Sequence, residues 1–234
     1  MDKRESPIGT WRLGAEGEAT PVEGSRGEFV HEAIKAGIRE GVLVPGQRLR
    51  EREVAEWLGV SRTPVREAFR MLQAQGVLSQ GKGDSLVITT LSEADMRELY
   101  RIWADMEAIS ARYAARQASR DDIERLHEVA ARWDEHLEPN ALGRLNQDFH
   151  RAIQAAAHNR YLSRALDAID DSLALLGLNT YTVPGRPAEA GREHLEIVRA
   201  IALRDEQAAF QAGRLHIERA GELRLALFRQ KSQN

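Results

Sequence analysis

Hydrophobic positions recur at helical spacing along most of this chain, and short polar or glycine-bearing breaks separate the stretches. In the first third they predict helices over residues 29–40 and 50–58, and a third from residue 62 to a stop at Gln75-Gly76. Two short apolar runs then flank a polar segment that contains glycine, Val77-Leu78 before it and Leu86-Val87-Ile88 after it. This pattern predicts a small β-hairpin behind the third helix.

The third helix begins with residues typical of a helix-turn-helix. Gly59 gives the backbone freedom that a tight turn needs, Ser61 is a good N-cap, and Pro64 is tolerated in the first turn. One face is apolar and is predicted to be buried: Val65, Ala68, Phe69 and Leu72. Beside it a cationic residue recurs every four positions: Arg62, Arg66 and Arg70. Such a row suits phosphate oxygens and guanine edges in the major groove, although it would also suit a solvated helix face with Glu67 as a local partner.

From Leu91 onward the chain is almost entirely helical in period. Six helices are predicted, opening at Ser92 and Ser119 and then covering residues 141–157, 160–177, 188–203 and 205–229. The serines are followed three residues later by Asp95 and Asp122, as in a capping box, and Pro139-Asn140 is expected to end the second helix. Met96, Leu99, Trp103, Met106 and Tyr113 are expected to form the buried stripe of the first helix.

The fold class is therefore mainly α, with three segments. Residues 1–25 are expected to be a mobile tail, residues 26–90 a winged helix-turn-helix, and residues 91–234 an all-α antiparallel bundle.

Three histidines fall on predicted inner faces of the bundle, His150, His194 and His216, and Asn146 lies one turn before His150. Three helices could bring these imidazoles together as metal ligands. For any one of them taken alone, a core histidine that bonds a neighbouring carbonyl or hydroxyl is the more common case. A third interpretation is a catalytic metal site with Glu107 as general base.

Composition narrows the class of protein. The 234 residues are 42% hydrophobic and 29% charged and include no cysteine, so no disulfide or thiolate metal site is expected, which fits a reducing cytoplasm. No apolar run approaches the length that spans a membrane. The net charge is −3, but residues 26–90 hold 10 Lys or Arg and 8 Asp or Glu, which gives +2 there and −5 elsewhere. The segment with the cationic row is thus the positive part of the chain.

The first domain resembles the winged helix of GntR-family regulators. The residues that carry the resemblance are Pro45-Gly46, Leu49, Arg52-Glu53, the unbroken run from Leu58 to Ala68, and Gly76-Val77-Leu78. The resemblance implies contacts with double-stranded DNA from the second helix, the start of the third helix and the wing tip, namely Arg52, Ser61, Arg62, Thr63, Arg66, Lys82 and Gly83.

Residues 92 to 228 are similar to the FadR-type effector domain. The similarity is carried by Asn146, Phe149-His150, Asn159, His194, Ile197-Val198, Ala200-Ile201, Asp205, Ala208-Ala209 and His216-Ile217. It implies a homodimer and a divalent metal of the zinc or nickel class, held by an aspartate and three histidines together with a small organic acid. His150, His194 and His216 match the histidines, and Asn146 stands where aspartate is most frequent. Trp103 takes the ligand-facing position, four before Glu107, where the family often has an arginine.

Together these features predict a ligand-responsive transcriptional regulator, a repressor of a catabolic operon that binds an inverted-repeat operator, and not an enzyme. A metal-dependent hydrolase built on His150, His194 and His216 is the alternative. A helical module whose first domain binds protein instead of DNA is a third possibility, against which the arginine row argues.

Overall fold

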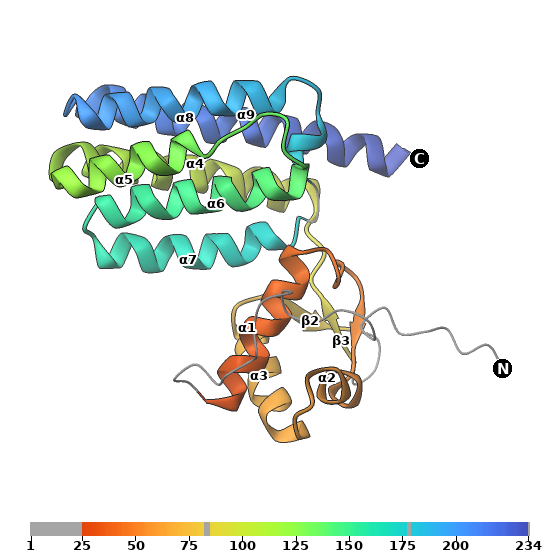
Figure 1. Ribbon diagram of the computed structural model, residues 1–234. Coiled ribbons are helices and arrows are strands. Elements are labelled where there is room, and N and C mark those ends of the chain that lie inside the picture. Colours follow the sequence, from red (N-terminus) through yellow and green to blue (C-terminus); the bar gives the residue numbers. More distant parts are fainter. Residues whose placement is uncertain (1–24, 82–84, 177–178, 234) are drawn as a thin grey trace. The chain divides into compact units, whose positions relative to one another are not determined.

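The computed structural model describes residues 25–81, 85–176 and 179–233 (Figure 1). The predicted tail, apart from Ser25, and the predicted wing-tip residues Lys82 and Gly83 lie outside the described residues. The chain divides into two compact units. The first comprises the residues up to Leu91 together with Asp170–Gly177, and the second comprises Ser92–Ile169 and Leu178–Asn234.

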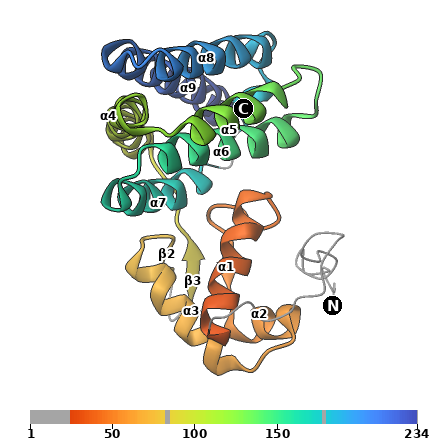
Figure 2. The same ribbon diagram turned by 60° about the vertical axis from the view of Figure 1, so that its left-hand side comes forward.

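Three helices dominate the first unit: α1 (Arg26–Arg39), α2 (Glu51–Leu58) and α3 (Arg62–Ala74) (Figure 2). Helix α1 begins three residues earlier than the apolar pattern predicts, because Ser25 and Glu28 form a capping box that opens it. Gly59 ends α2 in the left-handed conformation, with φ 65° and ψ 31°. This confirms the role predicted for glycine in the turn between α2 and α3.

A three-stranded antiparallel sheet completes the first unit, in the order β1-β3-β2. Strands β2 (Leu78–Gln80) and β3 (Leu86–Ile88) form the predicted hairpin. Strand β1 (Arg48–Leu49) pairs with the other edge of β3 and was not predicted. Two residues are too short for an alternating pattern to mark them as a strand.

The core of the first unit lies between α1, α3 and the sheet. The predicted buried face of α3 is confirmed, since Val65, Ala68, Phe69 and Leu72 are all buried. They join one hydrophobic cluster with side chains of α1, α2 and the strands, which include Val30, Ile34, Leu49, Val54, Leu78 and Ile88. This packing fixes one face of α3 and leaves the opposite face to solvent.

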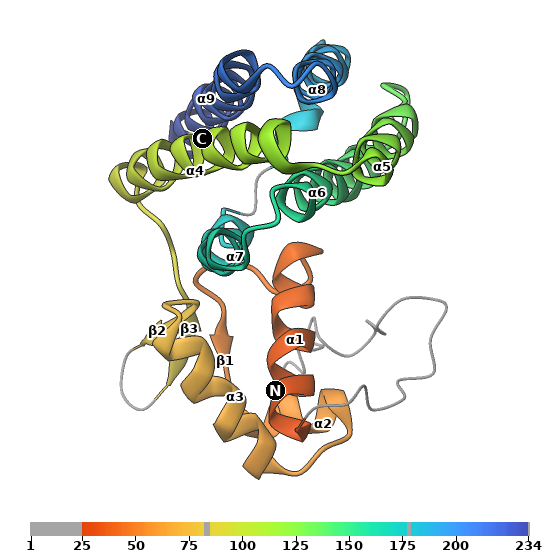
Figure 3. The same ribbon diagram turned by 90° about the vertical axis from the view of Figure 1, so that its left-hand side faces the viewer.

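After Leu91, the described part of the chain contains six long helices, as predicted; their arrangement is seen in Figure 3. They are α4 (Glu93–Gln117), α5 (Arg120–Ala131), α6 (Pro139–Ala156), α7 (Arg160–Ala174), α8 (Arg186–Ala202) and α9 (Glu206–Gln233), with a short 3-10 helix η1 (Thr180–Thr182) before α8. Helix α4 packs most extensively against α9, α9 also packs against α8, and α5 against α6. No helix in the described part of the chain is both long and apolar enough to cross a lipid bilayer.

Local signals set most helix ends in the second unit. Ser92 with Asp95 and Ser119 with Asp122 form the capping boxes predicted from the sequence. The expectation that Pro139 ends a helix was wrong. Pro139 is the first residue of α6, a position where the missing backbone N–H costs nothing. Helix α7 crosses the division between the units, because its residues from Asp170 count with the first.

The buried stripe of α4 differs from the predicted one. Met96 and Trp103 are buried as expected, but Leu99, Met106 and Tyr113 are only half-buried. Tyr100 and Glu107 take the inner positions instead, together with a run of alanines and Ser110. Small side chains let α4 lie close to α9, and the buried carboxylate of Glu107 marks the inside of the bundle as chemically unusual.

Candidate nucleic-acid interface and effector site

The outer face of α3 carries the residues predicted to contact DNA. Arg62, Arg66 and Arg70 are all exposed, while the apolar residues between them face the core. Ser61 occupies the N-cap position, but its hydroxyl makes no capping hydrogen bond, and Thr63 beside it is exposed. The N-terminal end of α3 therefore presents cations and short hydroxyl side chains to solvent.

Two of the predicted DNA-contact arginines form ion pairs within the first unit. Nε of Arg66 donates to both carboxylate oxygens of Glu51, at 2.9 and 2.8 Å. Nη1 of Arg52 lies 3.6 Å from Oε1 of Glu56, one turn further along α2. The partner of Arg66 is thus a residue of α2 and not Glu67, its neighbour on α3.

The second unit brings together the four residues predicted to bind a metal. The ring centroids of His150 and His216 lie 5.3 Å apart, those of His194 and His216 4.8 Å, and those of His150 and His194 6.4 Å. Oδ1 of Asn146 lies 3.1 Å from Nε2 of His194. Helices α6, α8 and α9 therefore supply a cluster of three buried imidazoles with an amide oxygen beside one of them.

Two buried carboxylates lie within hydrogen-bonding distance of rings of this cluster. Oε2 of Glu107 lies 3.1 Å from Nδ1 of His150, and Oε2 of Glu193 lies 2.6 Å from Nδ1 of His216. Buried Arg186 also binds Glu193, with Nη1 donating to Oε1 and Nη2 near Oε2, both at 2.9 Å. Carboxylates on the second nitrogen of a histidine are typical of metal sites, where they fix the ring.

The roles of these charges were not predicted from the sequence, in which Glu107 is a candidate only for a general base and nothing marks Glu193 or Arg186. Glutamate is usually exposed, so the pattern gave little reason to place either carboxylate inside the bundle. The one signal was spacing, because Glu107 lies four residues after inward-facing Trp103.

Burial and charge set the protonation of the cluster. Burial lowers the pKa of His194 well below its usual 6.5, and the neighbouring His216 and His150 lower it further. Burial also lowers the pKa of His216 to about 4, although Glu193 acts in the opposite direction. Burial raises the pKa of Glu193, but hydrogen bonds from His216 and Arg186 outweigh it and bring the pKa to about 2. At neutral pH, His216 is therefore a neutral imidazole that donates Nδ1–H to an ionised Glu193.

Glu107 is also ionised. Burial raises its pKa, yet the charge and hydrogen bond of His150 outweigh that effect, so the net shift of the pKa is downward. Glu107 and Glu193 thus place two buried negative charges around the imidazoles, where Arg186 and Arg219 offset Glu193 and a positive charge on His150 offsets Glu107. A metal ion bound to neutral His150 would take the place of that positive charge beside Glu107.

The residue types fit a divalent metal. The rings of His150 and His194 lie 5.3 and 4.8 Å from that of His216, spacings that suit rings bound to one ion. The 6.4 Å between His150 and His194 is longer than two rings on one tetrahedral ion allow. Nδ1 of His194 is buried and makes no hydrogen bond. Among the described residues, however, no three His, Cys, Asp or Glu side chains already form a set of metal ligands, so a bound ion requires the rings to turn.

Trp103 lies beside the cluster, where the effector was predicted to bind. Its ring centroid is 5.6 Å from that of His150, and its Nε1 donates to Oε1 of Glu107 at 3.3 Å. Phe149 stacks on His194 with centroids 4.1 Å apart, and Trp133 meets the same ring edge-on at 4.7 Å. Aromatic side chains therefore surround the imidazoles and separate them from bulk water.

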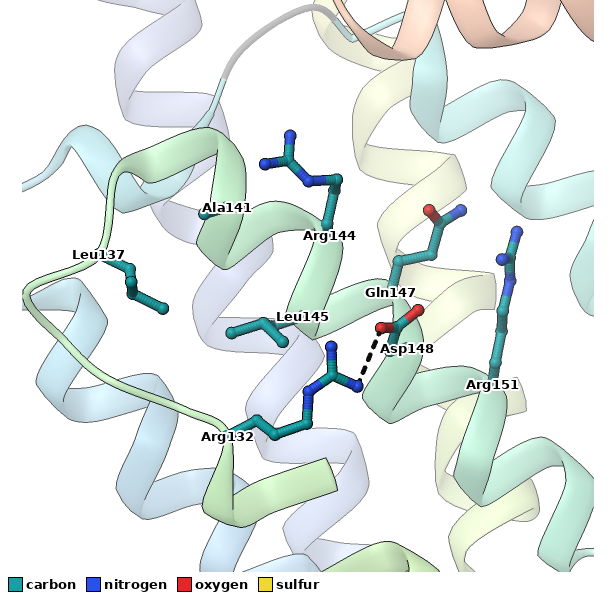
Figure 4. Close-up of a pocket in the computed structure, with 8 residues that line it drawn as sticks. All are labelled: Arg132, Leu137, Ala141, Arg144, Leu145, Gln147, Asp148 and Arg151. Carbon is teal, nitrogen blue, oxygen red and sulfur yellow. Dashed lines mark ion pairs between the residues drawn. The ribbon is translucent and has the colours of Figure 1, made fainter. Parts of the chain in front are cut away.

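A separate surface pocket of about 710 Å³ lies on the other side of α6 (Figure 4). It is lined by Arg132, Leu137, Ala141, Arg144, Leu145, Gln147, Asp148 and Arg151. Arg132 and Asp148 pair across it at 3.5 Å. None of the predicted ligand residues lines this pocket, so the buried cluster is the better candidate for the effector site.

Comparison with known families matches both halves of the chain. Residues 26–88 match the family described as "Bacterial regulatory proteins, gntR family", and residues 98–219 match the FCD domain. This chain belongs to the GntR family. Its relatives are transcriptional regulators and not enzymes, so the hydrolase interpretation of the histidine cluster has no support.

Two relatives of this GntR-family chain are named as operon regulators. The "Probable D-xylose utilization operon transcriptional repressor" of Paenarthrobacter nicotinovorans is 32% identical over 195 residues, 80% of this chain and 84% of the relative. The "Glc operon transcriptional activator" of Escherichia coli strain K12 is 30% identical over 216 residues, 81% of this chain and 85% of the relative. The solved structure of E. coli McbR/YncC is 20% identical and covers 89% of this chain and 99% of its own, with a TM-score of 0.74, which supports the same fold.

Proposed function

We propose that this chain is a cytoplasmic repressor that binds an inverted-repeat operator as a homodimer and senses a small organic acid through its FCD domain. The exposed cationic face of α3 supports the DNA-binding part, and the names of operon regulators among the relatives support the regulatory part. A symmetric dimer presents two such helices, so its operator has matching half-sites.

One observation carries the sensing part: Asn146, His150, His194 and His216 lie together inside the bundle, from three different helices. These four side chains would hold a divalent metal of the zinc or nickel class. The bound metal would supply open coordination positions for the carboxylate of the effector. Glu107 and Glu193 would keep the rings of His150 and His216 oriented toward it.

The charged and aromatic residues around the imidazoles would each have a separate role. Asn146 is neutral and brings no negative charge to a bound cation. Glu107 and Glu193 would partly compensate for this, because both are negatively charged and lie next to the rings. Trp103, Phe149 and Trp133 form apolar walls that exclude water from the rings and strengthen the polar contacts inside. With tryptophan at residue 103, an effector would meet an apolar surface and an indole N–H there, instead of a guanidinium.

The experiment measures DNA affinity and metal content on the same preparations. Wild type and His194→Ala are purified, their metals are measured, and their binding to a duplex from upstream of their own gene is titrated with a series of small carboxylic acids and Zn²⁺ or Ni²⁺. We expect the wild type to retain a metal and at least one acid to change its dissociation constant for DNA, with both effects lost in His194→Ala. A wild type that retains no added metal, with DNA affinity unmoved by every acid, would overturn the sensing proposal.

A further inference from the structure

The ion pair between Glu51 and Arg66 joins the start of α2 to the DNA-facing side of α3. Both carboxylate oxygens accept from the same nitrogen of Arg66, Nε, at 2.9 and 2.8 Å. Both side chains are accessible to solvent, 36% exposed for Glu51 and 57% for Arg66. Exposed ion pairs contribute little to folding stability, so a stabilising role alone gives a weak reason for this contact.

The neighbours of Arg66 in the same row are different. Within the described residues, neither Arg62 nor Arg70 makes an ion pair, so α3 has one arginine held by a carboxylate between two that are not. A carboxylate at this position reduces the positive charge that the helix presents to any phosphate. It therefore weakens binding to all DNA sequences by a similar amount.

The contact with Glu51 leaves part of the Arg66 guanidinium available to bind DNA. Glu51 engages Nε, on the inner side of the guanidinium, and the described contacts between the two residues include neither Nη1 nor Nη2. Arginine reads guanine with two parallel N–H donors directed at O6 and N7. A guanidinium held at Nε presents its outer pair of amino groups in a fixed direction.

We infer that Glu51 is a positioning residue for DNA reading: it orients Arg66 so that the outer amino groups meet a guanine edge, and it opposes contacts with phosphate. The inference depends on the proposed role of Arg66 in DNA binding. Orientation improves binding only where the base accepts both donors, whereas the carboxylate disfavours phosphate contacts everywhere. Glu51 therefore raises the ratio of specific to non-specific affinity.

The experiment selects binding sites from a random pool of double-stranded DNA with the full chain and with Arg66→Ala, Glu51→Ala and Glu51→Gln variants. Glu53→Ala is the matched control, because Glu53 lies in the same turn of α2 and pairs with Arg50 at 3.0 Å instead. Affinity is then measured for the wild-type site and for a scrambled duplex of the same length.

We expect Arg66→Ala and Glu51→Ala to relax the preference at the same base pair of each half-site. Glu51→Ala should lower the ratio of specific to non-specific affinity by about 5- to 140-fold, the range expected for one arginine–guanine contact. Glu51→Gln keeps an acceptor for Nε and should recover part of the base preference, while Glu53→Ala should match the wild type. Glu51→Gln keeps the size of the side chain, so it still tests the inference if Glu51→Ala folds poorly.

Two results would overturn the inference, and they differ. If Arg66→Ala relaxes a base pair and both Glu51 variants keep the wild-type preference everywhere, Glu51 does not position Arg66. If Arg66→Ala itself leaves every preference unchanged, the proposed role of Arg66 fails and the inference about Glu51 fails with it.

Discussion

Nδ1 of His216 lies 2.6 Å from Oε2 of Glu193, and both side chains are buried. The same carboxylate accepts from Arg186, and Nη1 of half-exposed Arg219 donates to its Oε1 at 3.0 Å. One glutamate thus joins the start of α8 to two positions on α9, and it orients a histidine of the candidate effector site. The arrangement connects the stability of the bundle with the chemistry of the imidazoles.

Removal of the carboxylate should destabilise the bundle strongly. Glu193→Ala would leave the guanidinium of Arg186 buried without its partner, a change that typically costs about 3–5 kcal/mol. We expect a loss of that size in the free energy of unfolding, measured by urea denaturation. Glu189→Ala is the control, because Glu189 is exposed and its carboxylate is 3.8 Å from Arg186, so its loss should cost about 1 kcal/mol or less. Equal losses for the two variants would contradict the account.

The stability of the metal-free chain should fall as the pH falls. Glu193 has its pKa lowered from 4.5 to about 2, so it stabilises the fold above pH 4.5 and this contribution is lost as the pH approaches 2. His216 has its pKa lowered from 6.5 to about 4. Between those values the unfolded chain binds a proton that folded His216 does not, so acid favours unfolding in that window as well.

The contribution of His216 can be separated by substitution. His216→Gln should flatten the dependence of unfolding free energy on pH between 6.5 and 4, by about 1.4 kcal/mol per pH unit at most. His136→Gln should leave the curve unchanged, since the side chain of His136 is 85% exposed. Urea denaturation in the presence of a chelator, repeated across this pH range, provides the comparison. If His216→Gln keeps the wild-type slope of unfolding free energy against pH, the buried neutral side chain of His216 does not cause the loss of stability in acid.

Restoring a carboxylate at residue 146 should tighten metal binding. Asn146→Asp would add a negative charge at the proposed metal site, and the resemblance to FadR-type effector domains implies aspartate as the usual ligand at this position. We expect the dissociation constant for Zn²⁺ or Ni²⁺ to fall by roughly tenfold or more. Gln147→Glu gives the same change of charge on the outer side of α6, where it lines the surface pocket, and should have little effect. Competition with a chromophoric chelator measures both, and the same affinity for both variants would contradict a site at Asn146.

The helices were largely predictable because their ends carry local chemistry. Gly59 and Ser61 mark the turn before α3, and the Ser92 and Ser119 boxes open α4 and α5 within one residue of the predicted positions. These signals depend on neighbours in sequence, so they need no knowledge of the fold. Strand β1 was missed for the opposite reason, because only its pairing with β3 makes Arg48–Leu49 a strand.

The imidazole cluster was predictable in part. Helical spacing placed His150, His194 and His216 on inner faces, and the resemblance suggested that they converge. The buried network of Glu107, Glu193 and Arg186 was not foreseen, because charged residues are normally exposed and only tertiary packing shows that these compensate one another. The partner of Arg66 was likewise unforeseen, since Glu51 lies 15 residues away in the sequence.

The most direct test of the central claim measures binding of the Arg62→Ala, Arg66→Ala double variant to a duplex from upstream of its own gene. Two lost base or phosphate contacts should weaken binding by about 30-fold or more, while the oligomeric state stays that of the wild type. A double variant of Arg120 and Arg144, which removes two exposed arginines from the second unit, should bind like the wild type. Unchanged affinity of the α3 variant, with its fold and oligomeric state intact, would contradict the assignment of α3 as the DNA-reading helix.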